Sequence, residues 1–202
     1  MSKVAVFEYF PEESIIALNL PDGSTRQIRI NPGWAFGKGY HPTTKLCVKS
    51  LEDIFGESGA QEKQVGYVLD IGCGSGVLSI CAAALGAARV TGLDIDRAIL
   101  NEAESNVEMN GFSPKIDIRI GSPGELGGQF DLVVANILID SIVAISAEIT
   151  GVLNPGALLV TSGIKESEKH RALERFDECG LLFEKEYREG DWVALRFRNP
   201  GD

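Results

Sequence analysis

Hydrophobic residues gather in short runs that alternate along the chain with stretches of helical spacing. Short apolar runs are typical of buried strands, whereas apolar residues three and four positions apart indicate a helix. The predicted strands cover residues 68–71, 89–94, 115–120, 130–136 and 157–161. The predicted helices cover residues 43–55, 75–85, 96–110, 137–152 and 165–179. Strands that alternate with helices predict an α/β fold, in which a parallel sheet carries helices on both faces.

Hairpins are predicted at both ends of this pattern. Near the C-terminus, residues 181–188 and 192–198 flank Glu189-Gly-Asp191, which predicts an antiparallel hairpin at the edge of a seven-stranded mixed sheet. Near the N-terminus, strands over 14–20 and 25–30 flank a turn, and this hairpin is too small to be a domain of its own. We therefore expect residues 1–30 to form a short extension and residues 31–202 to form one main domain.

The segment Val68-Leu-Asp-Ile-Gly-Cys-Gly-Ser-Gly76 joins a buried strand to its helix. Glycine permits a sharp turn and lets a ligand approach the main chain closely. A dinucleotide fingerprint requires a small residue where Val77 stands, so that motif is incomplete. Asp94 ends the next strand, where an acidic side chain can bind ribose hydroxyls. Together these features predict a nucleotide-type cofactor, and a purely structural glycine turn is the alternative.

The composition excludes several classes of protein. A formal net charge of −10 argues against a broad nucleic-acid-binding face, and an acidic surface suits a basic protein partner. No apolar run approaches the roughly 20 residues that span a bilayer, and no secretory signal is visible. Glu102, Glu104 and Glu108 are interpreted as a solvated helix face. The cysteines lack C-x-x-C spacing, which argues against a zinc site and predicts small buried side chains in a reducing, cytoplasmic compartment. They are Cys47, Cys73, Cys81 and Cys179.

A glycine-rich loop, Asn31-Pro-Gly-Trp-Ala-Phe-Gly-Lys-Gly-Tyr-His-Pro-Thr-Thr44, leads into the first predicted helix, with Pro42 in its first turn. Trp34 and Phe36 are unusual in a surface loop. The loop either packs its aromatic residues on the core or covers a ligand, and its composition favours neither.

Three separated stretches together resemble the PrmA family of ribosomal protein L11 methyltransferases. They are the loop over 31–44, the segment Leu69–Gly76 and the segment Val133-Val-Ala-Asn-Ile-Leu138, and the likeness extends roughly from residue 28 to the C-terminus. The resemblance implies a Rossmann-like class I methyltransferase fold with S-adenosylmethionine (AdoMet) as cofactor. It also implies transfer of methyl groups to protein amines, either lysine side chains or an α-amine, with a ribosomal protein as the possible partner.

The resemblance also implies the site residues. The residues expected to bind the cofactor are Phe36, Thr44, Asp70, Gly72, Gly74, Asp94 and Asn136. Asn136 is also the expected catalytic residue, because its side-chain carbonyl can accept an N–H from an amine and direct the lone pair. A simple helix cap is the alternative for Asn136, and a hold on the glycine turn is the alternative for Asp70. His41 could act as a base or position its loop, and Trp192 is expected to be structural.

The chain departs from the family pattern at two points. Lys38 and Tyr40 replace two threonines of the family's loop, so contacts there are expected to differ. About thirty residues precede Asn31, too few for the family's separate substrate-recognition domain, which we expect to be absent. Two alternatives therefore stay open. One is a methyltransferase for a small-molecule amine or another protein's lysine, and the other is a non-catalytic AdoMet-binding module.

Overall fold

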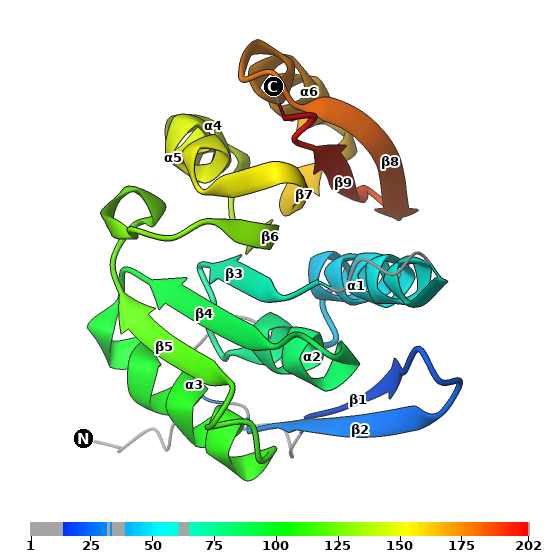
Figure 1. Ribbon diagram of the computed structural model, residues 1–202, viewed down its shortest axis with the longest axis vertical. Coiled ribbons are helices and arrows are strands. Elements are labelled where there is room, and N and C mark those ends of the chain that lie inside the picture. Colours follow the sequence, from blue (N-terminus) through cyan, green and yellow to red (C-terminus); the bar gives the residue numbers. More distant parts are fainter. Residues whose placement is uncertain (1–13, 32, 34–38, 61–64, 202) are drawn as a thin grey trace, which may run out of the picture.

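The computed structural model describes residues 14–31, 33, 39–60 and 65–201 (Figure 1). These residues form a seven-stranded sheet with the order β5-β4-β3-β6-β7-β9-β8. The strands are β3 (Tyr67–Ile71), β4 (Arg89–Asp94), β5 (Ile116–Ile120), β6 (Phe130–Asn136), β7 (Leu153–Lys165), β8 (Leu182–Glu189) and β9 (Trp192–Arg198). Strands β3 to β7 pair in parallel, and β9 runs antiparallel between β7 and β8. The predicted mixed α/β sheet with its C-terminal antiparallel hairpin is confirmed.

Helices cover both faces of this sheet, as predicted. They are α1 (Pro42–Ala60), α2 (Val77–Leu85), α3 (Arg97–Met109), α4 (Ile139–Ala144), α5 (Ser146–Gly151) and α6 (Lys169–Glu178), with short 3₁₀ turns η1 (Pro123–Glu125) and η2 (Glu166–Glu168). Successive strand residues point to opposite faces. Val68 and Val134 pack toward α1 and α2, whereas Leu69 and Val133 pack toward α4, α5 and α6. The sheet is therefore buried on both sides.

The N-terminal hairpin is confirmed and consists of β1 (Ser14–Asn19) and β2 (Thr25–Ile30), drawn in blue in Figure 1. Leu18, Ile28 and Ile30 are fully buried, and they belong to the same apolar cluster as residues of α1 and α2. The hairpin thus packs on the helical layer rather than on the central sheet. A domain boundary near residue 30 stays a prediction.

The single helix predicted over residues 137–152 is wrong, because α4 and α5 are separate and meet at Ile145. The Ser146 hydroxyl donates a hydrogen bond to the Val143 carbonyl at 2.9 Å and accepts one from Arg175 Nε at 2.6 Å. A serine side chain that binds a backbone carbonyl within its own turn competes with regular helix geometry. The apolar spacing of the sequence does not reveal this break.

Strand β7 is longer than the predicted strand over 157–161. Residues 154–156 form an irregularity inside the strand, because Phe130 pairs with Leu153 while Leu132 pairs with Leu158. At the other end, Ile164 and Lys165 still pair with β9. Since these residues remain in the sheet, α6 begins at Lys169 rather than at residue 165.

No helix in the described part of the chain combines the length and the apolarity that a membrane crossing requires.

Candidate functional site

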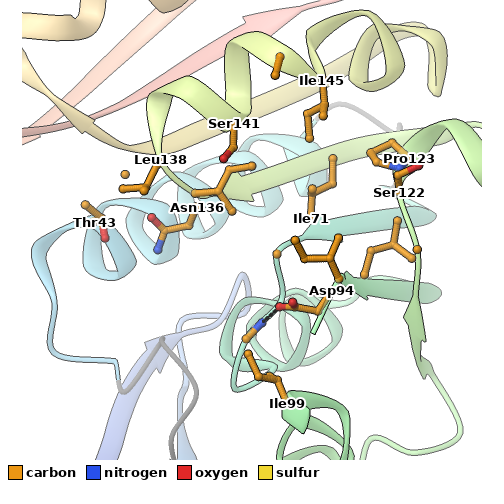
Figure 2. Close-up of a pocket in the computed structure, with 18 of the residues that line it drawn as sticks. Thr43, Ile71, Asp94, Ile99, Ser122, Pro123, Asn136, Leu138, Ser141 and Ile145 are labelled. Carbon is orange, nitrogen blue, oxygen red and sulfur yellow. Dashed lines mark hydrogen bonds between the residues drawn. The ribbon is translucent and has the colours of Figure 1, made fainter. Parts of the chain in front are cut away.

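A cavity of about 610 Å³ lies at the carboxyl ends of β3, β4 and β6 (Figure 2). Strand β3 is the point at which the strand order reverses, because β4 follows it on one side and β6 on the other. Open α/β sheets bind their ligands at such a point. The topology therefore places the site, and the residues that end these strands supply its chemistry.

The glycine turn after β3 forms the floor of the cavity. Gly72 and Gly74 line it and have φ angles of 69° and 53°, which favour glycine. A Cβ atom on Gly72 would overlap the side chain of Ile137, another lining residue. Gly76 is also left-handed, at φ 79°, and it precedes α2, so this helix begins two residues later than predicted. The turn therefore exposes main chain to a ligand.

Asp94 ends β4 and lines the same cavity. Its Oδ2 accepts a hydrogen bond from Gly74 N at 3.0 Å, drawn as a dashed line in Figure 2, and its Oδ1 accepts one from Asp96 N at 3.0 Å. Two backbone N–H groups thus hold the carboxylate in place. Each oxygen keeps a lone pair that can accept a hydrogen bond from a ligand hydroxyl.

Asn136 ends β6 on the other side of β3. Its Nδ2 lies 3.4 Å from Thr44 Oγ1, to which it donates. Its Oδ1 is buried and has no hydrogen-bond partner among the described residues. A buried carbonyl without a partner is costly, so a ligand N–H that reached it would be favoured. Thr44 itself is fully buried and lies outside the cavity wall, whereas its neighbour Thr43 lines it (Figure 2).

His41 and Trp192 form an aromatic wall of the cavity. Their rings meet edge to face, with centroids 5.2 Å apart. Nδ1 of His41 lies 2.8 Å from Thr43 Oγ1 and accepts the Thr43 backbone N–H at 3.3 Å. His41 therefore caps the start of α1. Trp192, which was expected to be structural, also lines the cavity, because β9 runs antiparallel to β7 and so begins at the carboxyl edge of the sheet.

Two apolar side chains on the cavity wall are unusually exposed. Ile95, directly after Asp94, is 86% exposed, and Leu138, two residues after Asn136, is 71% exposed. Exposed apolar side chains that line a concave site mark a binding surface. Neither residue was predicted from the sequence. Each lies just after the polar residue that ends its strand, and this position could have indicated a place in the cavity wall.

Asp70 is buried outside the cavity wall. Its Oδ2 accepts hydrogen bonds from Ser79 N at 2.9 Å and from Ser79 Oγ at 2.7 Å, which hold α2 against β3. Burial raises the pKa of the Asp70 carboxyl to about 6; the Ser79 hydrogen bonds oppose this shift and the charge on Asp94 adds to it. These bonds give Asp70 a structural contact with α2, and its contact with the cofactor stays a prediction. Phe36 lies outside the described residues.

An open sheet that reverses at β3, a glycine turn and an acidic residue at the end of β4 define the Rossmann-like fold of class I methyltransferases. The profile described as "Ribosomal protein L11 methyltransferase (PrmA)" matches residues 16–200. The chain belongs to this family, as its motifs predicted.

Curated relatives agree with this assignment. A ribosomal protein L11 methyltransferase from Geotalea daltonii is 43% identical over 172 residues, which cover 83% of this chain and 55% of the relative. One from Pelotomaculum thermopropionicum is 41% identical over 172 residues, which cover 85% of this chain and 54% of the relative. The chain thus spans about half the length of these relatives.

Solved structures share the fold. A ribosomal protein L11 methylase from Lactobacillus delbrueckii subsp. bulgaricus superposes with a TM-score of 0.73 at 32% identity, covering 84% of this chain and 83% of that one. Magnesium protoporphyrin IX methyltransferase from Synechocystis, crystallised with bound SAM, gives a TM-score of 0.60 at 19% identity, covering 78% of this chain and 83% of that one. The second likeness concerns the fold alone.

Proposed function

We propose that this chain is an AdoMet-dependent N-methyltransferase that acts on an amine of a ribosomal protein. The observation that carries the proposal is that Asp94 and Asn136 line the same cavity. Asp94 offers a fixed carboxylate and Asn136 a buried carbonyl without a partner among the described residues. Membership of the PrmA family supports the same reaction.

The residues of the cavity fit AdoMet. A volume of about 610 Å³ lies within the range of small-molecule sites. A side chain at position 72 would collide with Ile137, so the glycine keeps this part of the turn free of a side chain at the cavity. Asp94 would accept hydrogen bonds from the ribose hydroxyls, and Ile95 and Pro123 offer apolar surface to the base. AdoMet, when bound, supplies a methyl group activated by a positively charged sulfur.

The other end of the cavity suits an uncharged amine. Of the described residues that line it, Asp94 is the single carboxylate, so none at the Asn136 end would stabilise an ammonium group. Reaching the neutral form of a lysine amine costs about 4–5 kcal/mol at neutral pH, and an apolar wall lowers the amine pKa. Leu138 and Trp192 supply that wall. Asn136 Oδ1 would accept one N–H and orient the nitrogen lone pair.

The test is transfer of a labelled methyl group from AdoMet to purified ribosomal proteins and, in parallel, to a cell extract. We expect label in ribosomal protein L11, and we expect the Asn136→Ala variant to lose it. Label that appeared solely in small molecules or in another protein would overturn the proposed acceptor. AdoMet binding without transfer to any amine would overturn the catalytic proposal and favour a non-catalytic module.

A further inference from the structure

Helix α3 and the residue that caps its C-terminus carry three polar side chains on one face: Glu102, Asn106 and, at the cap, Asn110. They are spaced four residues apart and therefore lie one above the other along the helix. We refer to these three residues as the α3 polar row. Asn106, in the middle, is fully buried, which is unusual for an amide side chain unless both its polar atoms are bonded.

The α3 polar row binds the backbone of the chain as it leaves β2. Asn110 Oδ1 accepts from Arg29 N at 3.0 Å, and its Nδ2 donates to Arg29 O at 2.7 Å. Asn106 Oδ1 accepts from Asn31 N at 2.9 Å. Glu102 Oε1 accepts from Gly33 N at 3.2 Å. The interpretation of Glu102 as part of a solvated face is therefore wrong.

The spacing of the row matches that of the backbone where β2 ends. Four helical residues rise about 6 Å, and two extended residues advance about 6.6 Å, so Asn110 and Asn106 reach Arg29 and Asn31. Glu102, one turn further along the row, binds Gly33 N. The segment that the row binds opens the loop that ends at His41 and Thr43 in the cavity wall.

Asn106 binds Asn31 through its amide oxygen, and it also binds the glycine turn through its amide nitrogen. Its Nδ2 donates to the Ser75 carbonyl at 2.9 Å. Ser75 follows Gly74, whose N–H holds Asp94. One buried amide therefore joins the turn that forms the cavity floor to the segment that leads to the cavity wall.

We propose that Asn106 is a positioning residue for the cofactor site, acting through Ser75 and Asn31 rather than by contact with the cofactor. The inference rests on the proposed function. Loss of the Nδ2 donor would leave the Ser75 carbonyl buried without this partner, and the turn would relax to satisfy it. That movement would shift Gly74 and, with it, the Asp94 carboxylate.

The test compares Asn106→Asp with Val107→Ala. Aspartate keeps an acceptor for Asn31 and places an oxygen, instead of a donor, against the Ser75 carbonyl. Val107 is the adjacent buried residue of α3 and packs into the apolar core. We expect Asn106→Asp to raise the AdoMet dissociation constant about tenfold, with kcat at saturating cofactor changed less than about twofold. Val107→Ala should lower Tm and leave the dissociation constant unchanged.

Glu102→Ala provides a second variant if Asn106→Asp does not fold. It removes the bond to Gly33 N from a half-buried position, and we expect a rise of about threefold in the dissociation constant. The positioning role would be overturned if Asn106→Asp and Glu102→Ala folded and bound AdoMet with an unchanged dissociation constant. An equal rise of the dissociation constant in Val107→Ala would overturn it as well. If the parent chain bound no AdoMet, the proposed function would fall as well, so the two failures are distinguishable.

Discussion

Asp94 and Asn136 end the two strands on either side of β3, and we expect them to have different roles in the cavity. Asp94 is expected to bind the cofactor and Asn136 to act on the methyl acceptor. Asp94→Ala should weaken AdoMet binding about 100-fold, since each hydrogen bond to a charged group contributes about 1.5–3 kcal/mol. Asn136→Ala should lower kcat about 100-fold and change cofactor affinity less than about threefold. Calorimetric titration and steady-state kinetics measure the two effects. Equal losses of affinity and turnover in Asn136→Ala would contradict its role at the acceptor.

Asp70 gives the protein a specific dependence of stability on pH. Its pKa is raised in the fold, so the native chain binds more protons than the unfolded chain between pH 3.8 and about 6. The contribution of Asp70 to the free energy of unfolding is fully present below this window. It is lost as the pH rises through the window, by up to about 3 kcal/mol.

Asp70→Asn isolates this effect, because the amide keeps a carbonyl to accept from Ser79 but does not ionise. We expect the variant to gain stability relative to the parent as the pH rises from roughly 4 to roughly 7. Urea denaturation at several pH values measures the difference in the free energy of unfolding between variant and parent. The other carboxylates titrate in both proteins, so their contributions cancel in this difference. A difference that did not change with pH would show that Asp70 ionises as readily in the fold as in the unfolded chain.

At the residue scale, the sequence points to positions that follow or end strands. Gly72 and Gly74 follow β3, and Asp94 and Asn136 end β4 and β6. All four line the cavity, because parallel strands end at one edge of the sheet, and their binding roles stay predictions. The prediction for this site named Thr44, whereas the neighbouring Thr43 lines the cavity. Adjacent helical residues point about 100° apart, and which of them faces the cavity depends on how α1 packs. No local pattern carries that information.

At the scale of elements, the contact between β7 and the segment after β6 fixes the shape of the cavity. Gly163 lines the cavity with φ 85°, and a Cβ atom there would overlap the Ile137 carbonyl oxygen. Gly180, at φ 80°, has open space around it and is a matched control. We expect Gly180→Ala to cost about 1 kcal/mol and Gly163→Ala at least about 1 kcal/mol more. Urea denaturation of both variants tests this, and equal losses would show that β7 can move aside.

The bounds of β4 and β6 could be predicted because each is a short segment that holds buried apolar residues and ends in a polar residue. The break between α4 and α5 could not, because Arg175, which binds Ser146, lies 29 residues further along the chain. The full length of β7 likewise depends on pairing with β9. Local patterns predict elements that are defined by their own residues, and they miss those defined by distant partners.

At the scale of the whole molecule, ligand binding and folding are linked. AdoMet at 100 times its dissociation constant should add about 2.7 kcal/mol to the free energy of unfolding. For a chain of this size we expect a rise in Tm of roughly 5–10 °C. Thermal denaturation with and without AdoMet measures it, and the Asp94→Ala variant at the same concentration should shift little. A parent chain that did not respond to saturating AdoMet would contradict the assigned cavity.

The N-terminal hairpin has a consequence for the limits of the folding unit. Its side chains Leu18, Ile28 and Ile30 are shielded from water together with α1 and α2, and its exit is tied to α3. We therefore expect that a chain shortened to begin at residue 31 would expose the apolar faces of α1 and α2. The same truncation would also destabilise the glycine turn at the ligand site. A fusion protein that includes this domain would therefore need to retain both β1 and β2.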